Sequence, residues 1–455
     1  MRKRVFLAIS LVVALILTTS CSLIVKDQEV DKSTVIIEAA GKTFTKEEVQ
    51  EQVNLTLDYQ EYIYSMYGMS YDKTDATAIA EAQESVISSM IELAVIDQKK
   101  VENGMTELSA EDVAAVQTEA DETYQGYVDS VKTQYFAETE LEGEELDKAV
   151  DEKLVELGYS TVDEIVTVLS ENKATENLRA DIVKDVAVSD DEIQAEFDVR
   201  VTNAKATYET TPAAYGTAVT NGTAVYYAPA GYRYVKHILR QLTTEDSAAI
   251  SEIQTQVTSK QTQLTTAQTA LTALGEAAES EDEAIATQRT EYEATIETLN
   301  TEIADLNTQL DAAKETGYAA IQPMIDEIQA KIDEGQDFDA LIEEYGEDPG
   351  MQSSPAKENG YLVCEASNNW VAEFTSASMA LSNVGDVSPA VRTSYGVHII
   401  KYESDLAEGD VELDTVKDVI SEELLANKQD ALYEETVAQW VTDANAKSYL
   451  DRLVK

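Results

Sequence analysis

A repeat of apolar residues between 250 and 310 restricts the fold of this 455-residue chain more than any other feature. Apolar side chains recur in alternating steps of three and four residues, and the only polar exception in the first arm is Lys260. The first arm comprises Ile250, Ile253, Val257, Leu264, Ala267, Leu271 and Leu274, and the second Ile285, Tyr292, Ile296, Leu299, Ile303, Leu306 and Leu310. The polar segment GEAAESED separates the arms, so the pattern predicts an antiparallel helical hairpin over 246–316. The sequence leaves open whether this hairpin is a solvated spacer, a client-binding arm or an arm for docking or dimerisation.

The segments on either side of the hairpin predict a small sheet with helices. VKHILRQL (235–242) has the pattern of a buried strand, and helical patterns follow from 321, with a turn at Gly335. A short strand at NGYLV, a helix at WVAEFTSASMAL and a closing strand at YGVHIIKYE complete the order. The two outer strands carry His237 and His398, the only histidines of the chain. If these strands pair in one sheet, the two imidazoles lie side by side.

Helical signals dominate before this region. A short strand and a turn at Gly41 lead into a helix that starts at Thr45, and the spacing of a capping box recurs at Thr161/Glu164 and Ser189/Glu192. These signals predict a helical domain over 34–199. Residues 200–229, rich in Gly, Thr, Tyr and Pro, predict an extended linker. The chain ends in a predicted helical tail over 404–455, which carries Trp440.

The N-terminus predicts export. Arg2, Lys3 and Arg4 precede an apolar run, Val5–Leu17, that suits a secretory signal better than a membrane span. The segment LTTSC resembles a bacterial lipobox, in which Cys21 is acylated, although Thr18 stands where an aliphatic residue is usual. We expect a signal peptide at 1–20 and a tether from the lipid anchor at 21–33. The alternative is an ordinary cleaved signal with an incidental cysteine.

Charge and cysteine content narrow the function classes. With 87 acidic and 33 basic residues, the formal charge of −54 argues against nucleic-acid binding, because phosphates would be repelled. Cys364 is the only cysteine besides Cys21, which argues against a disulfide framework. His237, His398 and Asp348 are the only candidate metal ligands and form a poor metal site. Neither a Ser-His-Asp arrangement nor a phosphate-binding glycine loop is visible.

The segments around the hairpin resemble the parvulin family of peptidyl-prolyl isomerases. KHIL (236–239) is similar to the family's first strand, EGQDFDALIEEYGEDPG (334–350) to its helix-and-loop segment, and NGYL (359–362) to its GGdLG turn. The segment 370–402 resembles the closing block, so the resemblance covers roughly 230–245 and 320–403. With the export signal and the helical flanks, the whole chain resembles extracytoplasmic foldase lipoproteins of the PrsA type, related in layout to SurA.

This resemblance implies an α+β fold: a helical chaperone module with an inserted parvulin domain over 230–403, built from a small antiparallel sheet plus helices and interrupted by the hairpin. The tail 404–455 is then expected to pack on the N-terminal domain. By position the resemblance also implies the site, with no cofactor and no metal. The implied catalytic residues are His237, Asp348 and His398, and the implied substrate-binding residues are Leu362, Trp370, Phe374 and Tyr395.

Prolyl isomerisation rotates an amide over a barrier of roughly 18–20 kcal/mol without breaking a bond. An apolar slot that desolvates the carbonyl, above a rigid His–His–Asp network, could lower this barrier. The histidine pair could equally be purely structural. Val363 replaces a usual Gly and Glu365 a usual aromatic residue, which leaves a second hypothesis, a holdase whose isomerase site has lapsed.

The resemblance also implies partners and a location. The expected partners are unfolded or partly folded exported polypeptides with Xaa-Pro segments and the membrane, through a lipid at Cys21. The sequence leaves open whether a second copy of the chain forms a homodimer with the first. The expected location is the outer face of the bacterial cell membrane.

Overall fold

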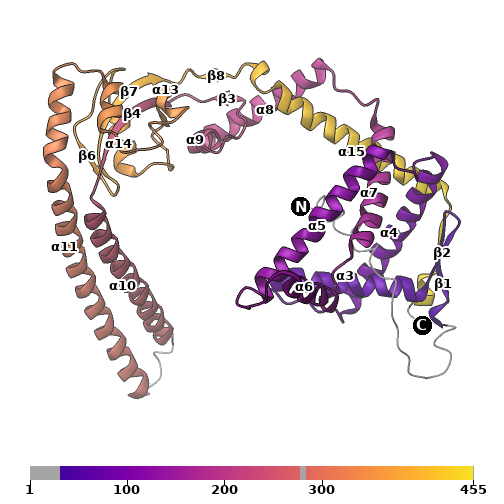
Figure 1. Cartoon of the computed structure of the whole chain (residues 1–455). Helices are drawn as coiled ribbons and strands as arrows, with labels where there is room; N and C mark the ends of the chain where they lie inside the picture. The colour runs from indigo at the N-terminus through magenta and orange to yellow at the C-terminus, as the bar shows by residue number, and fades with distance from the viewer. Residues whose placement is uncertain (1–30, 277–282, 454–455) are drawn as a thin grey trace. The chain divides into compact units, whose positions relative to one another are not determined.

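The structure is a computed structural model that describes residues 31–276 and 283–453 (Figure 1). It divides into two compact units, one up to Val188 and again from Glu422, the other Ser189–Ser421. The predicted signal peptide, Cys21 and most of the tether lie outside the described residues. Within the part that is described, no helix combines the length and the apolarity needed to cross a bilayer.

The first unit is helical, and its helices begin where the sequence signals place them. Thr45 caps its helix in a capping box with Glu48, and Thr161 does the same with Glu164. Its helices are α3 (Lys46–Met66), α4 (Ala76–Glu102), α5 (Ala110–Tyr135), α6 (Gly143–Leu157), α7 (Val162–Val183) and the short α16 (Leu450–Leu453). A small sheet of order β2-β1-β9 completes it, from β1 (Val35–Ala39), β2 (Lys42–Thr45) and β9 (Lys447–Ser448).

The C-terminal helix α15 (Lys417–Asp443) packs on the N-terminal helices of this unit. Val437 and the partly buried Trp440 join a cluster with Ile96 and Leu178. Arg179 on α7 forms an ion pair with Asp430 on α15 at 2.5 Å. Segments from both ends of the chain therefore build one helical core, because each helix buries its apolar stripe against the other.

The second unit begins earlier than expected, and the segment predicted as an extended linker is largely helical. Ser189 caps α8 (Asp190–Thr210), and α9 (Ala213–Thr220) follows. The prediction for 200–229 is therefore corrected over 200–220. The tyrosines of this segment explain the difference, since Tyr215 stacks edge-on against Tyr232 and the amide of Gly216 donates to the Tyr232 hydroxyl at 2.9 Å. Only β3 (Tyr227–Ala228), which pairs with β8 (Gly409–Asp410), is extended here.

The hairpin predicted over 246–316 is present as α10 (Thr244–Glu276) and α11 (Glu283–Asp333). Lys260, the polar exception in the repeat, forms an ion pair with Glu302 at 2.7 Å, a contact that fixes one register of the arms. The sequence predicts a separate helix after the hairpin, but α11 continues through Pro323 and ends at Asp333, two residues before Gly335 with its φ of +82°.

A four-stranded antiparallel sheet of order β5-β4-β7-β6 forms the centre of the second unit. Its strands are β4 (Arg233–Gln241), β5 (Tyr361–Val363), β6 (Val391–Thr393) and β7 (Gly396–Asp405), accompanied by α12 (Phe338–Tyr345), α13 (Ala356–Asn359) and α14 (Ala372–Ala380). The strands β4 and β7 pair along their whole length, with Leu239 opposite His398 and His237 opposite Ile400. These four side chains share one face, since residues two apart on a strand point the same way.

The two faces of this sheet bury different clusters. Ile238, Val397 and Ile399 point to one face, where they pack with α11 and α12 through Ile325, Ile328 and Leu341. Val235 and Ile400 point to the other face and pack with Val363 and Phe374. The sheet therefore separates an apolar helical layer from the side that carries the two histidines, and the α+β class is confirmed.

Candidate active site

The two histidines lie in direct contact, as the strand pairing predicted. The Nδ1 atoms of His237 and His398 are 3.0 Å apart, and their rings are stacked with centroids at 5.0 Å. Both side chains are buried. Residues separated by 161 positions in the sequence are brought together because β4 and β7 are neighbours.

Asp348 extends the histidine pair on one side. Its Oδ2 atom lies 2.8 Å from Nε2 of His237 and accepts a second hydrogen bond, also 2.8 Å, from the hydroxyl of Tyr361. Its other oxygen accepts from the amide of Gly350. Asp348 follows α12 and Tyr361 begins β5, so three separate elements converge on one carboxylate.

Thr393 extends the pair on the other side. Its hydroxyl lies 2.9 Å from Nε2 of His398 and accepts from the backbone amide of Tyr395 at 3.1 Å. Thr393 is buried at the end of β6, which is the strand next to β7. A continuous chain of hydrogen bonds thus runs from the exposed loop at Tyr395 to Asp348.

The charges of this network follow from its surroundings. Burial raises the pKa of Asp348, but the hydrogen bonds from His237 and Tyr361 outweigh it, and the pKa falls to about 2. Burial, together with the neighbouring His237 ring, lowers the pKa of His398 to about 3. Burial and the bond to Asp348 raise the pKa of Tyr361. At neutral pH, Asp348 is therefore an anion, His398 is neutral and Tyr361 keeps the proton that it donates.

These protonation states assign the tautomers. The Asp348 carboxylate can only accept, so Nε2 of His237 carries a proton. When His237 is neutral, its Nδ1 accepts from Nδ1 of His398, and Nε2 of His398 then accepts from the Thr393 hydroxyl. Every polar atom of the two rings has a partner, which holds both rings in fixed orientations.

Aromatic rings cover the histidine pair. Phe374 on α14 packs edge-on against both imidazoles, with centroids at 5.1 Å from His237 and 5.3 Å from His398. Trp370 lies 5.9 Å from Phe374 and stacks on Tyr361 at 4.4 Å. Phe374 is only 3% exposed, whereas Trp370 and Tyr361 are partly exposed. Phe374 therefore lies on the inner side of this aromatic group, and Trp370 and Tyr361 form its partly exposed side.

The structure does not bring all predicted residues to the aromatic rings that cover the histidine pair. Leu362 points to the opposite side of β5 and packs with Tyr215, Tyr232 and Cys364, because alternate residues of a strand face opposite ways. Its expected place in the slot is therefore corrected. Tyr395 is 64% exposed and connects to the network only through its backbone amide.

The two departures from the parvulin pattern have different consequences. Val363 is fully buried and packs with Phe374 in the cluster Val235, Val363, Phe374 and Ile400, so it fills space beside the slot floor. Glu365 is exposed. Tyr361 and Thr393 were missed from the sequence. Tyr361 lies two residues before Val363, so the two side chains share one face of the strand. This spacing could have indicated that Tyr361 lies beside the site.

Replacing Tyr361 with Phe is expected to lower the free energy of unfolding by about 1.5 kcal/mol, since a partly buried hydrogen bond to a charged group is lost. The ring stack on Trp370 stays. Tyr402→Phe is the matched control, because the Tyr402 hydroxyl donates to the exposed Asp405, and we expect a smaller loss there. Urea unfolding monitored by the fluorescence of Trp370 measures the free energy of unfolding of both variants. Trp440 is changed to Phe in each protein, so that only Trp370 contributes. Equal losses of unfolding free energy in the two variants would contradict the larger contribution expected of the Tyr361–Asp348 hydrogen bond.

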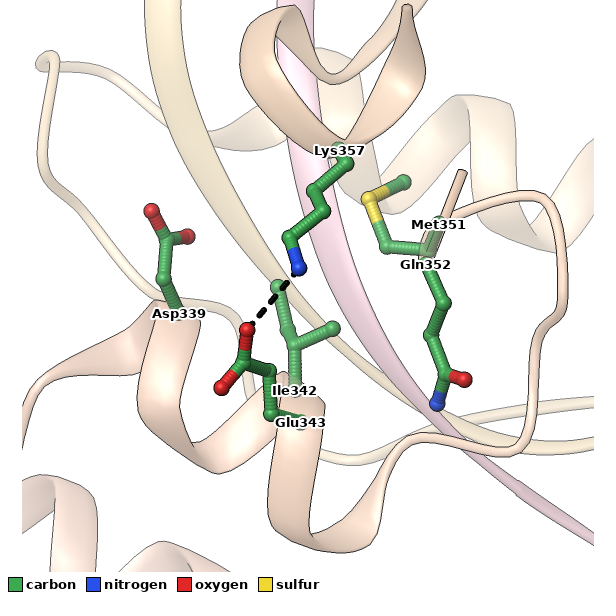
Figure 2. A pocket seen from close by; sticks show the side chains of 6 residues that line it. All are labelled: Asp339, Ile342, Glu343, Met351, Gln352 and Lys357. Atoms are coloured by element: carbon green, nitrogen blue, oxygen red, sulfur yellow. Dashed lines mark hydrogen bonds and ion pairs between the residues drawn. The ribbon is translucent and has the colours of Figure 1, made fainter. Parts of the chain in front are cut away.

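A surface pocket lies on α12 and the loop after it (Figure 2). It is lined by Asp339, Ile342, Glu343, Met351, Gln352 and Lys357, and Lys357 forms an ion pair with Glu343 at 2.9 Å. Ile342 and Met351 belong to the cluster on the helical side of the sheet. The pocket contains none of the residues predicted for the site.

Residues 306–404 match the family model of the PPIC-type peptidyl-prolyl isomerase (rotamase) domain. The chain carries a parvulin domain. The match begins inside α11, and β4, the strand with His237, lies upstream of both hairpin helices. The histidine pair, Asp348 and Phe374 are therefore contributed by both sides of the insertion.

The curated relatives that the chain matches are named foldases. The chain is 36% identical to the foldase protein PrsA of Geobacillus kaustophilus over 28% of its own length and 39% of that protein. It is 22% identical to PrsA of Clostridium acetobutylicum, over 93% of this chain and 91% of that protein. The alignments with the first two relatives, from Geobacillus kaustophilus and Oceanobacillus iheyensis, span 39% and 54% of those proteins. A crystal structure of PrsA from Bacillus subtilis matches at 16% identity over 91% of this chain and 94% of that one, with a TM-score of 0.20.

Proposed function

We propose that this chain is a peptidyl-prolyl cis-trans isomerase of the parvulin type and a foldase for exported proteins. The observation that carries the proposal is the contact of His237 with His398 and Asp348 beneath Phe374. The relatives named foldase PrsA and the matching rotamase model support it. His237, Asp348 and His398 serve as the catalytic residues, and Trp370, Phe374 and Tyr361 bind the proline.

The proposed mechanism needs no covalent step. An amide in an apolar slot loses the water that stabilises its polar resonance form, so rotation about C–N becomes easier. Phe374, Trp370 and Tyr361 supply the apolar walls. The buried network beneath them is neutral at His398 and anionic at Asp348, and its hydrogen bonds keep the floor rigid. A tenfold acceleration needs only about 1.4 kcal/mol of this stabilisation.

The test is cis–trans exchange of a short Ala-Pro peptide, measured by NMR with the purified chain. We expect acceleration by the wild type and at least a tenfold loss of that acceleration in His398→Ala. Lys401→Ala, on the same strand but outside the site, should leave the rate unchanged. Circular dichroism and the milder His398→Asn variant separate a catalytic loss from unfolding. A wild type that does not accelerate exchange overturns the proposal.

One observation favours a second candidate, a holdase without isomerase activity. Phe374 is 3% exposed, and Val363, which stands where the parvulin pattern has glycine, packs in the same cluster. A holdase would suppress aggregation of unfolded clients while leaving the exchange rate of the peptide unchanged. The same assay therefore decides between the two functions.

We also propose export and a lipid anchor at Cys21, which places the protein at the outer face of the cell membrane. The support is the basic and apolar N-terminus followed by LTTSC. The anchored chain should be recovered in the membrane fraction with an acylated N-terminal Cys21, and Cys21→Ser should move it to the medium. Mass spectrometry of the N-terminal peptide checks this, and an unmodified Cys21 in membrane-bound protein would refute it.

A further inference from the structure

The exposed side of helix α3 carries a dense group of aromatic and methionine side chains. Tyr59, Tyr62 and Met66 lie on one stripe of the helix, at spacings of three and four residues. Tyr67 and Met69 continue the group in the turn that follows. We call these five residues the tyrosine–methionine patch; their exposures are 40%, 59%, 65%, 75% and 52%.

This patch is separate from the core side of the same helix. Val49, Val53 and Leu57 are buried on the other side and pack against α4, so the fold of α3 does not need the exposed stripe. A surface helix usually presents polar residues to solvent, and grouped exposed apolar side chains mark interaction sites. Methionine and tyrosine adapt to partners of varied shape, which suits a surface that binds many sequences.

The charges around the patch select the kind of partner. Between Asp58 and Asp75 the chain carries four acidic residues and one basic residue. That basic residue, Lys73, already contacts Asp58 at 2.8 Å and Glu61 at 2.9 Å. The surroundings are therefore negative, as is the chain as a whole at −54. A second copy of the chain or an anionic membrane would be repelled, whereas a segment with basic residues would be attracted.

We infer that the tyrosine–methionine patch captures unfolded polypeptide segments that combine apolar and basic side chains. Aromatic or aliphatic residues of the segment contact Met66, Tyr67 and Met69, and its lysines or arginines face the acidic groups beside them. The patch holds such segments without prolyl chemistry. The inference rests on the proposed foldase function, because it names the client segments that the chain binds. It does not involve the isomerase site.

The test uses two labelled, unstructured, proline-free peptides of about 20 residues with the same leucines and phenylalanines. One carries lysines and the other carries glutamates at the same positions. Fluorescence anisotropy with the full chain should show at least tenfold tighter binding of the lysine peptide. The variant Met66→Ser/Tyr67→Ser/Met69→Ser should weaken that binding at least tenfold, with an unchanged circular dichroism spectrum.

The control variant Val101→Ser/Val113→Ser/Val155→Ser removes three scattered apolar side chains of similar exposure, 66%, 54% and 78%. It should bind within twofold of the wild type. Unchanged binding by the patch variant, an equal loss in the control, or equal binding of the two peptides overturns the inference. A sedimentation mass of two copies for the wild type and one for the patch variant would assign the patch to a dimer interface instead. Because the peptides lack proline, an inactive isomerase site would leave these results unchanged.

Discussion

Phe374→Ala is expected to lower the free energy of unfolding of the parvulin domain by about 3–5 kcal/mol and to abolish its acceleration of prolyl exchange. Phe374 is almost completely buried and contacts Val235, Val363 and Ile400 as well as both imidazoles. Truncation removes these contacts and leaves a cavity directly above the histidine pair. It also removes one of the apolar walls that are proposed to hold a proline ring.

Phe374→Leu separates the two effects. Leucine keeps most of the volume, so we expect a loss below about 2 kcal/mol, but it lacks the flat ring that packs edge-on against His237 and His398. Urea unfolding followed by Trp370 fluorescence, with Trp440 changed to Phe, reports stability, and the peptide exchange assay reports activity. An Ala variant that loses less than 1 kcal/mol would contradict the packing described for this ring.

The second large effect is a dependence of stability on pH that originates at His398. Its pKa is lowered from 6.5 to about 3 in the folded state, so the folded domain favours the neutral ring. Between these values the unfolded chain binds one proton more, and each unit of decreasing pH removes about 1.4 kcal/mol of stability. The contribution is complete above pH 6.5 and is lost progressively as the pH falls toward 3.

A comparison at pH 7.5 and 5.0 isolates this contribution. The 87 acidic residues titrate in every variant, so the informative quantity is the difference between the wild type and His398→Gln. We expect the wild type to lose about 2 kcal/mol more than the variant between the two pH values. Equal pH effects in both proteins would mean that His398 is protonated in the folded state, which contradicts its burial against His237.

The sequence predicted the elements of the site better than its details. The apolar runs around His237 and His398 indicated two buried strands, and strand pairing then required the two rings to meet. The helical hairpin followed from its repeat, and the caps at Thr45, Thr161 and Ser189 began helices as expected. These features depend on local pattern, which the sequence shows directly.

The errors arose where tertiary contacts decided the structure. Glycine, threonine and proline around 200–220 suggested an extended chain, but packing of Tyr215 against Tyr232 favours helix there. The face of the sheet to which Leu362 points depends on how the three-residue strand β5 pairs with β4. The place of Leu362 in the NGYL motif does not determine this pairing. Thr393 and Tyr361 became visible only when β6 and β5 joined the sheet beside β7 and β4.

The hairpin also affects the order in which the parvulin domain assembles. Strands β4 and β7 hold residues 161 positions apart, and closing so long a loop delays folding. The arms of the hairpin interact locally, and at its base Gly317 approaches Leu242 and Asp246 so closely that a methyl group there would lie 3.1 Å from Leu242. If α10 and α11 pair early in folding, the chain that follows the hairpin returns to the end of β4. The insertion that separates β4 from β7 in the sequence therefore shortens the loop that must close, and the sheet is expected to form soon after β7 is available.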